Sequence, residues 1–181
     1  TNTYNVAVGY NAGVANTTGE TNTFIGGTAG QANTSGNNNS AMGYAALFTN
    51  ILSDRNVAVG NNALYSHNQT TSVDSYNVAV GYNAGAGVTT GISNTIIGSL
   101  AGDALTDADY NTSVGVEALS ADTLGSRSVA IGYSALKSQN FTTATDTYNT
   151  AVGFDAGTAV TTGVYNSFVG GLSGDALTTG Q

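Results

Sequence analysis

The chain has 181 residues, only 8% of them charged, and three basic against eleven acidic residues give a net charge of −8. This balance disfavours nucleic acid and anionic membrane surfaces as partners, because both repel an acidic protein. The sequence contains no cysteine, which excludes disulfides and thiolate metal sites, and no apolar run approaches the roughly 18 residues of a membrane span. Since 40% of the residues are hydrophobic and recur regularly, we expect an ordered fold.

The nonamer NVAVGYNAG begins at Asn5 and returns unchanged at Asn77. Alignment on its first residue gives ten units, which start at Asn5, Asn22, Asn39, Asn56, Asn77, Asn94, Asn111, Ser128, Asn149 and Asn166. Three short units and one long unit follow one another in a fixed cycle, so that four units form a super-repeat that spans 5–76 and then 77–148. We interpret residues 1–181 as a single repeat domain. Because the sequence begins inside a repeat, we expect a processed chain or a fragment of a longer protein.

Each unit is expected to open with a β-strand of about five residues that ends at a glycine. This glycine occupies the same place in every unit, at Gly9, Gly26, Gly43, Gly60, Gly81, Gly98, Gly115, Gly132, Gly153 and Gly170. Because glycine occurs at this position in all ten units, we expect a positive φ angle or a backbone too crowded for a Cβ atom. We therefore predict a structural corner there.

Both faces of each predicted strand are apolar or small. The residue before the corner is always large and apolar, and we assign this lane to the core: Val8, Ile25, Met42, Val59, Val80, Ile97, Val114, Ile131, Val152 and Val169. The opposite face carries the residues that we predict as an oligomer interface, among them Ala7, Phe24, Ala79, Ile96, Ala151 and Phe168. A strand with two dry faces is normally covered on both sides. A one-layer coil covers only one of them, so we expect the chain to associate with itself.

The predicted fold class is all-β, a parallel β-solenoid or β-roll with one unit per coil. A helical fold is disfavoured, since the units lack the apolar periodicity of a helix and place Asn, Gly and Thr-Thr at fixed positions. Like residues then stack from coil to coil, with an asparagine ladder at the corner. At about 4.8 Å per coil, the rod would be on the order of 45–50 Å long. A further lane reads Gly, Gly, Leu, Leu in strict alternation, beginning at Gly13.

The pattern N-[VST]-[AFIS]-[VIM]-G-x-x-A, seen in NTAVGFDA from Asn149 and SVAIGYSA from Ser128, resembles the head repeats of trimeric autotransporter adhesins. It is equally similar to repeat arrays of phage tail fibres and related bacterial surface fibres. The resemblance covers essentially the whole chain. It implies a left-handed parallel β-roll assembled as a homotrimer, in an extracellular location on a virion tail fibre or a bacterial surface. The sequence departs from the adhesin pattern in two ways: both the short and the long units exceed the length that we expect for adhesin heads, and the residues show no coiled-coil stalk, membrane anchor or chaperone domain. We take the second departure to favour a fibre segment over a whole adhesin.

No motif for catalysis, metal binding or a cofactor emerges from the sequence. The only histidine, His67, lies in a lane of mixed character and is interpreted as a solvated loop residue instead of a catalytic base. Asp103 and Asp175, like Asp74 and Asp146, stand at equivalent positions of successive super-repeats, which we attribute to repetition of the unit. We therefore predict that the protein is not an enzyme and that it uses no cofactor or metal.

The two long units carry their extra residues in YSHNQTTSVDSY and KSQNFTTATDTY, which we expect to protrude from one edge of the rod. Protruding polar loops on a rigid scaffold often bind partners. The candidate receptor-binding residues are His67, Asn68, Gln69, Gln139, Asn140 and Phe141. Two functions stay open: a structural fibre segment that spaces or presents an adhesive tip, and a module that binds a host glycan or receptor through these loops. Packing of the loops on a neighbouring subunit is the alternative.

Overall fold

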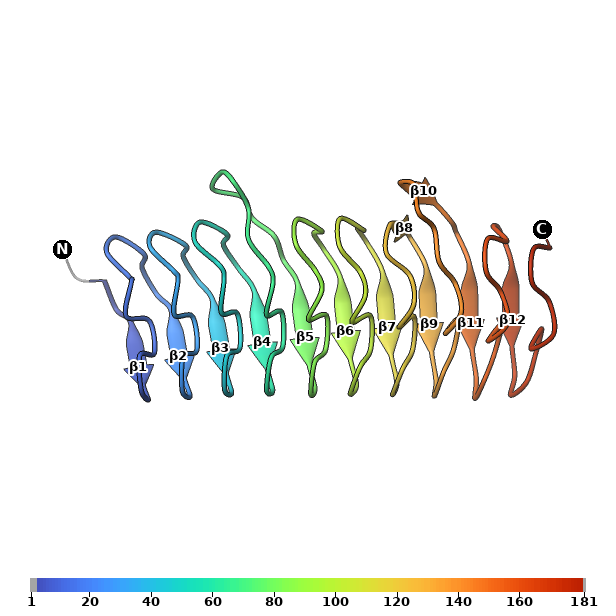
Figure 1. Ribbon diagram of the computed structural model, residues 1–181, viewed down its shortest axis with the longest axis horizontal. Coiled ribbons are helices and arrows are strands. Elements are labelled where there is room, and N and C mark those ends of the chain that lie inside the picture. Colours follow the sequence, from blue (N-terminus) through green and yellow to red (C-terminus); the bar gives the residue numbers. More distant parts are fainter. Residues whose placement is uncertain (1–2, 181) are drawn as a thin grey trace.

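The structure, a computed structural model, describes residues 3–180 as a rod of stacked coils (Figure 1). Ten strands form one parallel sheet along it: β1 Val6–Val8, β2 Thr23–Ile25, β3 Ser40–Met42, β4 Val57–Val59, β5 Val78–Val80, β6 Thr95–Ile97, β7 Thr112–Val114, β9 Val129–Ile131, β11 Thr150–Val152 and β12 Ser167–Val169. The prediction of an all-β parallel solenoid is confirmed, with strands of three residues instead of about five. The described residues include no helix that could cross a membrane.

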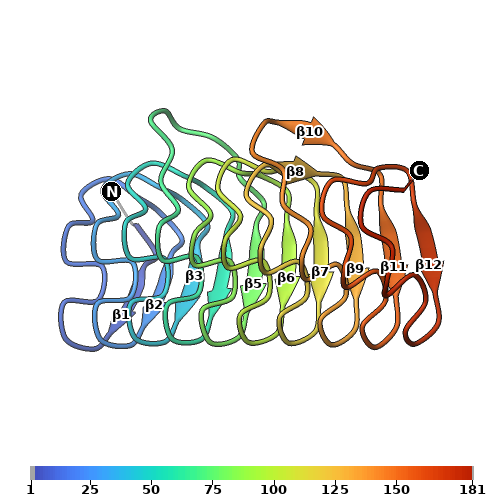
Figure 2. The same ribbon diagram turned by 45° about the vertical axis from the view of Figure 1, so that its right-hand side comes forward.

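Each main strand pairs in parallel with the strand of the next coil, so that equivalent residues touch. Val8 pairs with Ile25, and Ile25 with Met42. Across the long unit, Val57 pairs with Val78 in the same manner, which shows that the additional residues leave the sheet without disturbing its register. Viewed obliquely, each coil runs down the strand, turns, and climbs back on the other side of the rod (Figure 2).

The corner glycines have φ angles between 120 and 146°, a region that side chains of L-residues rarely enter. Crowding excludes a side chain as well: a Cβ atom added to Gly81 would lie 2.6 Å from the carbonyl oxygen of Gly98 in the next coil. Gly170 is an exception, since nothing lies within 4 Å of the position of its Cβ. Glycine is therefore required at these corners for two separate reasons, the positive φ angle and, at all of them except Gly170, the lack of space for a Cβ atom.

The two faces of the strands are the reverse of the sequence assignment. The middle residue of each strand points into the coil, and Phe24, Ala79, Ile96, Ala151 and Phe168 are at most 8% exposed. Ala7 occupies the same lane in the first coil, where it is exposed. The predicted interface lane is thus the core of the single chain, and the predicted core lane from Val8 to Val169 faces outward. The alternation of side chains along a strand assigns residues to two faces correctly, but it does not show which face is enclosed.

The interior is filled by complementary sizes in two lanes. Where the strand carries Ala41 or Ala58, the opposite wall supplies the fully buried Leu47 or Leu64. Where the strand carries a large residue, the wall carries glycine: a Cβ on Gly157 would lie 2.8 Å from the ring of Phe168. The alternation of two glycines and two leucines therefore follows from the volume of one shared space.

The interior leucines occupy a backbone conformation that disfavours them. Leu47 and Leu64 have φ angles of 53 and 50°, where their glycine counterparts Gly30 and Gly85 have 56 and 58°. A left-handed conformation costs a residue with a Cβ atom roughly 1–2 kcal/mol. Burial of a leucine side chain contributes about 1.5–3 kcal/mol, which is enough to offset that strain.

An asparagine ladder runs beside the strands, as predicted. Asn77 accepts a hydrogen bond at Oδ1 from the backbone N–H of Asn94 at 3.0 Å, and its Nδ2 donates to the carbonyl oxygen of Gly91 at 2.8 Å. The same two contacts recur at other rungs, for example at Asn22 with Asn39 and Gly36. Each of these side chains therefore bonds once within its own coil and once to the next coil, so that buried polar groups of both coils are satisfied.

Candidate functional site: the outward sheet face and the long loops

The outward face of the sheet carries a continuous apolar column, which we call the outward stripe. It consists of Val8, Ile25, Met42, Val59, Val80, Ile97, Val114, Ile131, Val152 and Val169. In the middle of the rod Ile97 and Ile131 are 39 and 37% exposed, although each is flanked by a like side chain on both sides. Apolar surface this continuous is uncommon on a monomeric protein and marks a surface for interaction.

Charge is excluded from the outward stripe and from the columns next to it. The column that begins at Val6 contains only valine, threonine and serine, and the column that begins at Tyr10 contains no charged residue. The nearest basic residues are Arg55 and Arg127, which precede the strands of their coils by two residues. Covering this face with another apolar surface would therefore bury no unpaired charge.

Aromatic side chains border the outward stripe on both sides. The rings of Tyr133 and Phe154 stack with their centroids 5.3 Å apart, and those of Tyr148 and Tyr165 stack at 5.4 Å. The guanidinium of Arg127 lies 4.8 Å from the centroid of Tyr110. Each of these stacks covers one face of the two rings involved, and the rings of Phe154 and Tyr165 stay 55 and 66% exposed.

The long loops fold back over the preceding coil and are held there by backbone pairing. Strands β8, Gly125–Ser126, and β10, Thr145–Asp146, form a small parallel pair, and an isolated bridge joins Asp54 to Asp74 at the equivalent place. Only the tips project (Figure 1). Residues 70–72 and 142–144 are exposed.

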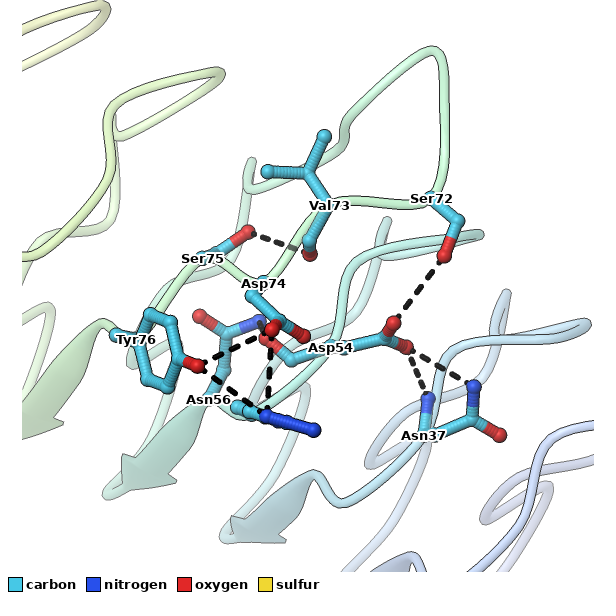
Figure 3. A network of polar contacts seen from close by, with 9 residues as sticks. Asn37, Asp54, Asn56, Ser72, Val73, Asp74, Ser75 and Tyr76 are labelled. Carbon is cyan, nitrogen blue, oxygen red and sulfur yellow. Dashed lines mark hydrogen bonds and ion pairs between the residues drawn. The ribbon is translucent and has the colours of Figure 1, made fainter.

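Polar side chains brace the base of the first loop (Figure 3). Arg55 contacts Asp74 and the hydroxyl of Tyr76, both at 3.2 Å. Asp54 accepts hydrogen bonds from the Ser72 hydroxyl at 3.1 Å and from the Asn37 side chain at 3.2 Å, which ties three coils together. The second loop repeats the ion pair, with Arg127 2.9 Å from Asp146.

Three of the predicted loop-binding residues are inside the protein. His67 and Gln139 are completely buried and Phe141 is 7% exposed, so the prediction of a solvated His67 and of receptor contacts by these three side chains is wrong. Asn68 and Gln69 are half-buried, and Asn140 is exposed. The exposed loop tips begin only at Thr70 and Thr142, because the preceding residues of each insert still complete the wall of the coil.

A buried polar network replaces the asparagine ladder where Ser128 interrupts it. Gln139 donates from Nε2 to Ser128 Oγ at 2.9 Å and to Asp122 Oδ2 at 2.6 Å, and its Oε1 accepts from Asn149 Nδ2 at 2.8 Å. Asp122 also accepts from the backbone N–H groups of Gly125 and Phe141, both at 3.0 Å. Gln139 is thus a structural residue that carries the ladder across the gap.

All three basic residues form ion pairs, the third being Lys137 with Glu117 at 2.6 Å. The hydrogen bond from Lys137 lowers the pKa of Glu117. Burial raises the pKa values of Asp103 and Asp109 above the usual value for aspartate. With its cations paired, the protein keeps an acidic surface outside the uncharged sheet face.

Residues 3–180 form no pocket and contain no group of three or more acidic or histidine side chains that could hold a metal ion. Searches with protein-family models, among curated proteins and among solved structures each found no match. The surfaces to be explained are therefore the outward stripe and the two loop tips.

Proposed function

We propose that this chain is a structural segment of an extracellular fibre, in which three copies associate in parallel through their outward stripes to make a rigid rod. Such a rod spaces or presents an adhesive tip, on a phage tail fibre or a bacterial surface filament. The proposal includes a left-handed β-roll with one coil for each short or long repeat unit. The number three and the handedness follow from the resemblance to adhesin and tail-fibre repeats.

The observation that carries the proposal is the apolar, uncharged and exposed outward stripe. Covering the remaining exposed surface of a valine or isoleucine stabilises an assembly by roughly 1 kcal/mol per side chain, about half the value for full burial. The stripe runs along the whole sheet, so the contributions add over many coils. Parallel association matches each coil of one copy with the same coil of another, which is the arrangement that symmetric oligomers use.

The mechanism of such a segment is mechanical. Backbone hydrogen bonds join every coil to the next, and the asparagine side chains join them a second time. Bending the rod would stretch both sets of bonds on one side. Continuous hydrogen bonding also leaves few loose segments, apart from the two loop tips, for a protease to enter.

Substitutions on the two faces of one strand test the proposal. Val80→Asp places a carboxylate on the outward stripe and should separate the copies while each chain keeps its fold. Ala79→Asp places the carboxylate in the core and should disrupt the coils themselves. Val14→Asp is the matched control, since Val14 is 63% exposed outside the stripe and its bordering columns. Sedimentation and circular dichroism distinguish the cases, and a Val80→Asp protein that assembles like the unmodified chain would exclude the stripe as the interface.

A second function, binding of a host glycan or receptor, is favoured by the exposed loop tips. Two such tips project from one side of the rod, each braced by an arginine–aspartate pair (Figure 2). Replacing Thr142 and Thr143 with alanine leaves the buried Gln139 and Phe141 untouched. Loss of binding on a glycan array with unchanged assembly would establish this role, whereas equal binding by both proteins, or by neither, would leave the fibre role alone.

A further inference from the structure

His67 is the only histidine of the chain and lies inside the fourth coil, with none of its surface exposed. It stands in a lane of interior side chains, between Asn50 of the third coil and Val88 of the fifth. Neither Nδ1 nor Nε2 has a hydrogen-bond partner. Burying a neutral imidazole without hydrogen bonds costs free energy, and burying a charged imidazole costs more, because it places two unsatisfied donors and a full charge in the core.

The equivalent coil of the second super-repeat, at 128–148, has a hydrogen-bonded side chain at the corresponding interior position. Gln139 occupies the position of His67, and its amide is bonded to Asp122, Ser128 and Asn149. The two long coils therefore share a shape and a surface loop but differ in one respect. One has a satisfied polar interior, and the other holds an unpartnered group that titrates.

No ionised side chain stands ready to compensate a charge on His67. The charged residues of the third and fourth coils are Asp54, Arg55 and Asp74, and the fifth coil has none. Asp54 is occupied by Ser72 and Asn37, and Arg55 and Asp74 pair with each other where each side chain is 45% exposed. The tyrosines of these coils, Tyr44, Tyr65, Tyr76 and Tyr82, are exposed. Protonation thus meets only uncharged groups in the interior.

We propose that the coil from Asn56 to Tyr76 is an acid-sensitive section of the rod, which opens together with its loop when His67 takes up a proton, while the equivalent coil at 128–148 stays closed. This inference does not depend on the proposed fibre function, because every contact that it uses lies within one chain. Opening would release the loop tip at Thr70 and, because strand β4 belongs to this coil, expose the edges of the adjoining strands β3 and β5.

The direction of the pH effect follows from the pKa of His67, which burial lowers from 6.5 to about 4, and the opposing effect of the nearby Thr89 backbone is smaller. A histidine with a depressed pKa contributes its stability above the unfolded value and loses it as pH falls from 6.5 towards 4. From pH 7 to pH 5 the equilibrium constant for opening should therefore rise about 20-fold. At pH 5 the chain is still above its isoelectric point of about 4.1 and keeps a negative charge.

Hydrogen exchange measured on peptides of the full chain at pH 7 and pH 5, corrected for the intrinsic rates, tests the proposal. We expect protection in 56–76 to fall about 20-fold while protection in 128–148 is unchanged. The single histidine also gives one imidazole signal in a proton NMR titration, and this signal should show no titration near pH 6.5 in the closed state. Equal loss in both coils, no loss in 56–76, or titration of the closed state near 6.5 would overturn the proposal.

His67→Gln supplies the side chain that the equivalent coil uses, and should abolish the difference between the two pH values. His67→Asn, which repeats the residue at Asn50, serves as a second replacement if the first fails to fold. A variant that folds and still loses protection at pH 5 would assign the acid response to another group. The NMR titration of the unmodified chain decides the matter independently of either variant.

Discussion

Ile96 and Gly85 occupy one shared space in the interior of the rod, although they belong to neighbouring coils. A Cβ atom on Gly85 would lie 2.8 Å from Cδ1 of Ile96. Ile96→Ala should cost about 2–5 kcal/mol of unfolding free energy by leaving a cavity. Gly85→Leu should cost about 1–3 kcal/mol by overpacking. Together they exchange which of the two neighbouring residues fills the space, so the double variant should recover about 1–3 kcal/mol relative to the sum.

Chemical unfolding of the two single variants and the double variant measures this coupling. Ile97→Ala is the control, because Ile97 is the outward neighbour of Ile96 and should show no coupling to Gly85. Strict additivity of Ile96→Ala and Gly85→Leu would mean that the two residues do not share a volume.

The corner glycines allow strain and crowding to be separated. Gly98→Ala meets both a φ angle of 136° and the carbonyl of Gly115, whereas Gly170→Ala meets a φ angle of 120° with nothing within 4 Å. We expect Gly170→Ala to cost about 1–3 kcal/mol from strain alone. Gly98→Ala should cost clearly more, since the neighbouring backbone must move. Equal shifts of the unfolding midpoint in the two variants would show that crowding is unimportant.

The asparagine ladder predicts a large effect from a small deletion at Asn77. Asn77→Ala removes the acceptor for the Asn94 N–H and the donor for the Gly91 carbonyl, both of them in the interior. Each buried group left without a partner costs about 1–3 kcal/mol, so a loss of about 2–5 kcal/mol is expected. Thermal unfolding measures it, with the exposed Asn61→Ala as control. A loss no larger than that of the control would remove the ladder from the account of stability.

The two loops should differ in how strongly arginine holds them. Arg127 lies over the rings of both Tyr110 and Tyr148, whereas Arg55 lies over Tyr76 alone. Each exposed ion pair or cation–π contact contributes at most about 1 kcal/mol. Arg127→Ala should therefore accelerate proteolysis at 142–144 several-fold, and more than Arg55→Ala does at 70–72. The reverse order would contradict this comparison.

The sequence was sufficient to predict the coil, its register and its corner, because these depend on residues that repeat at fixed spacing. It was not sufficient to say which strand face is enclosed, since both the Val8 column and the Phe24 column are apolar. The sequence does contain a pattern that identifies the enclosed face, namely a correlation between residue sizes in two columns. Each large residue in the Phe24 column coincides with a glycine in the column of Gly30, and each leucine of that column coincides with a small residue, as expected if the two columns share a volume.

The candidate loop residues failed for a related reason. His67 and Gln139 are polar and stand at the start of the long inserts, which is typical of a surface loop. Their lane also contains Val88, Leu105 and Val160, all fully buried, and such members indicate an interior position. The contacts of Gln139 with Asp122 and Ser128 depend on side-chain geometry across two coils, and spacing along the chain carries no information about them.

The central claim is that the outward stripe, with ten large apolar side chains on one face, is covered by further copies of the same chain. The mass of the native assembly in dilute solution tests it most directly. The account predicts three times the 18.0 kDa of a single chain. A folded protein that sediments as one chain at every concentration would contradict it.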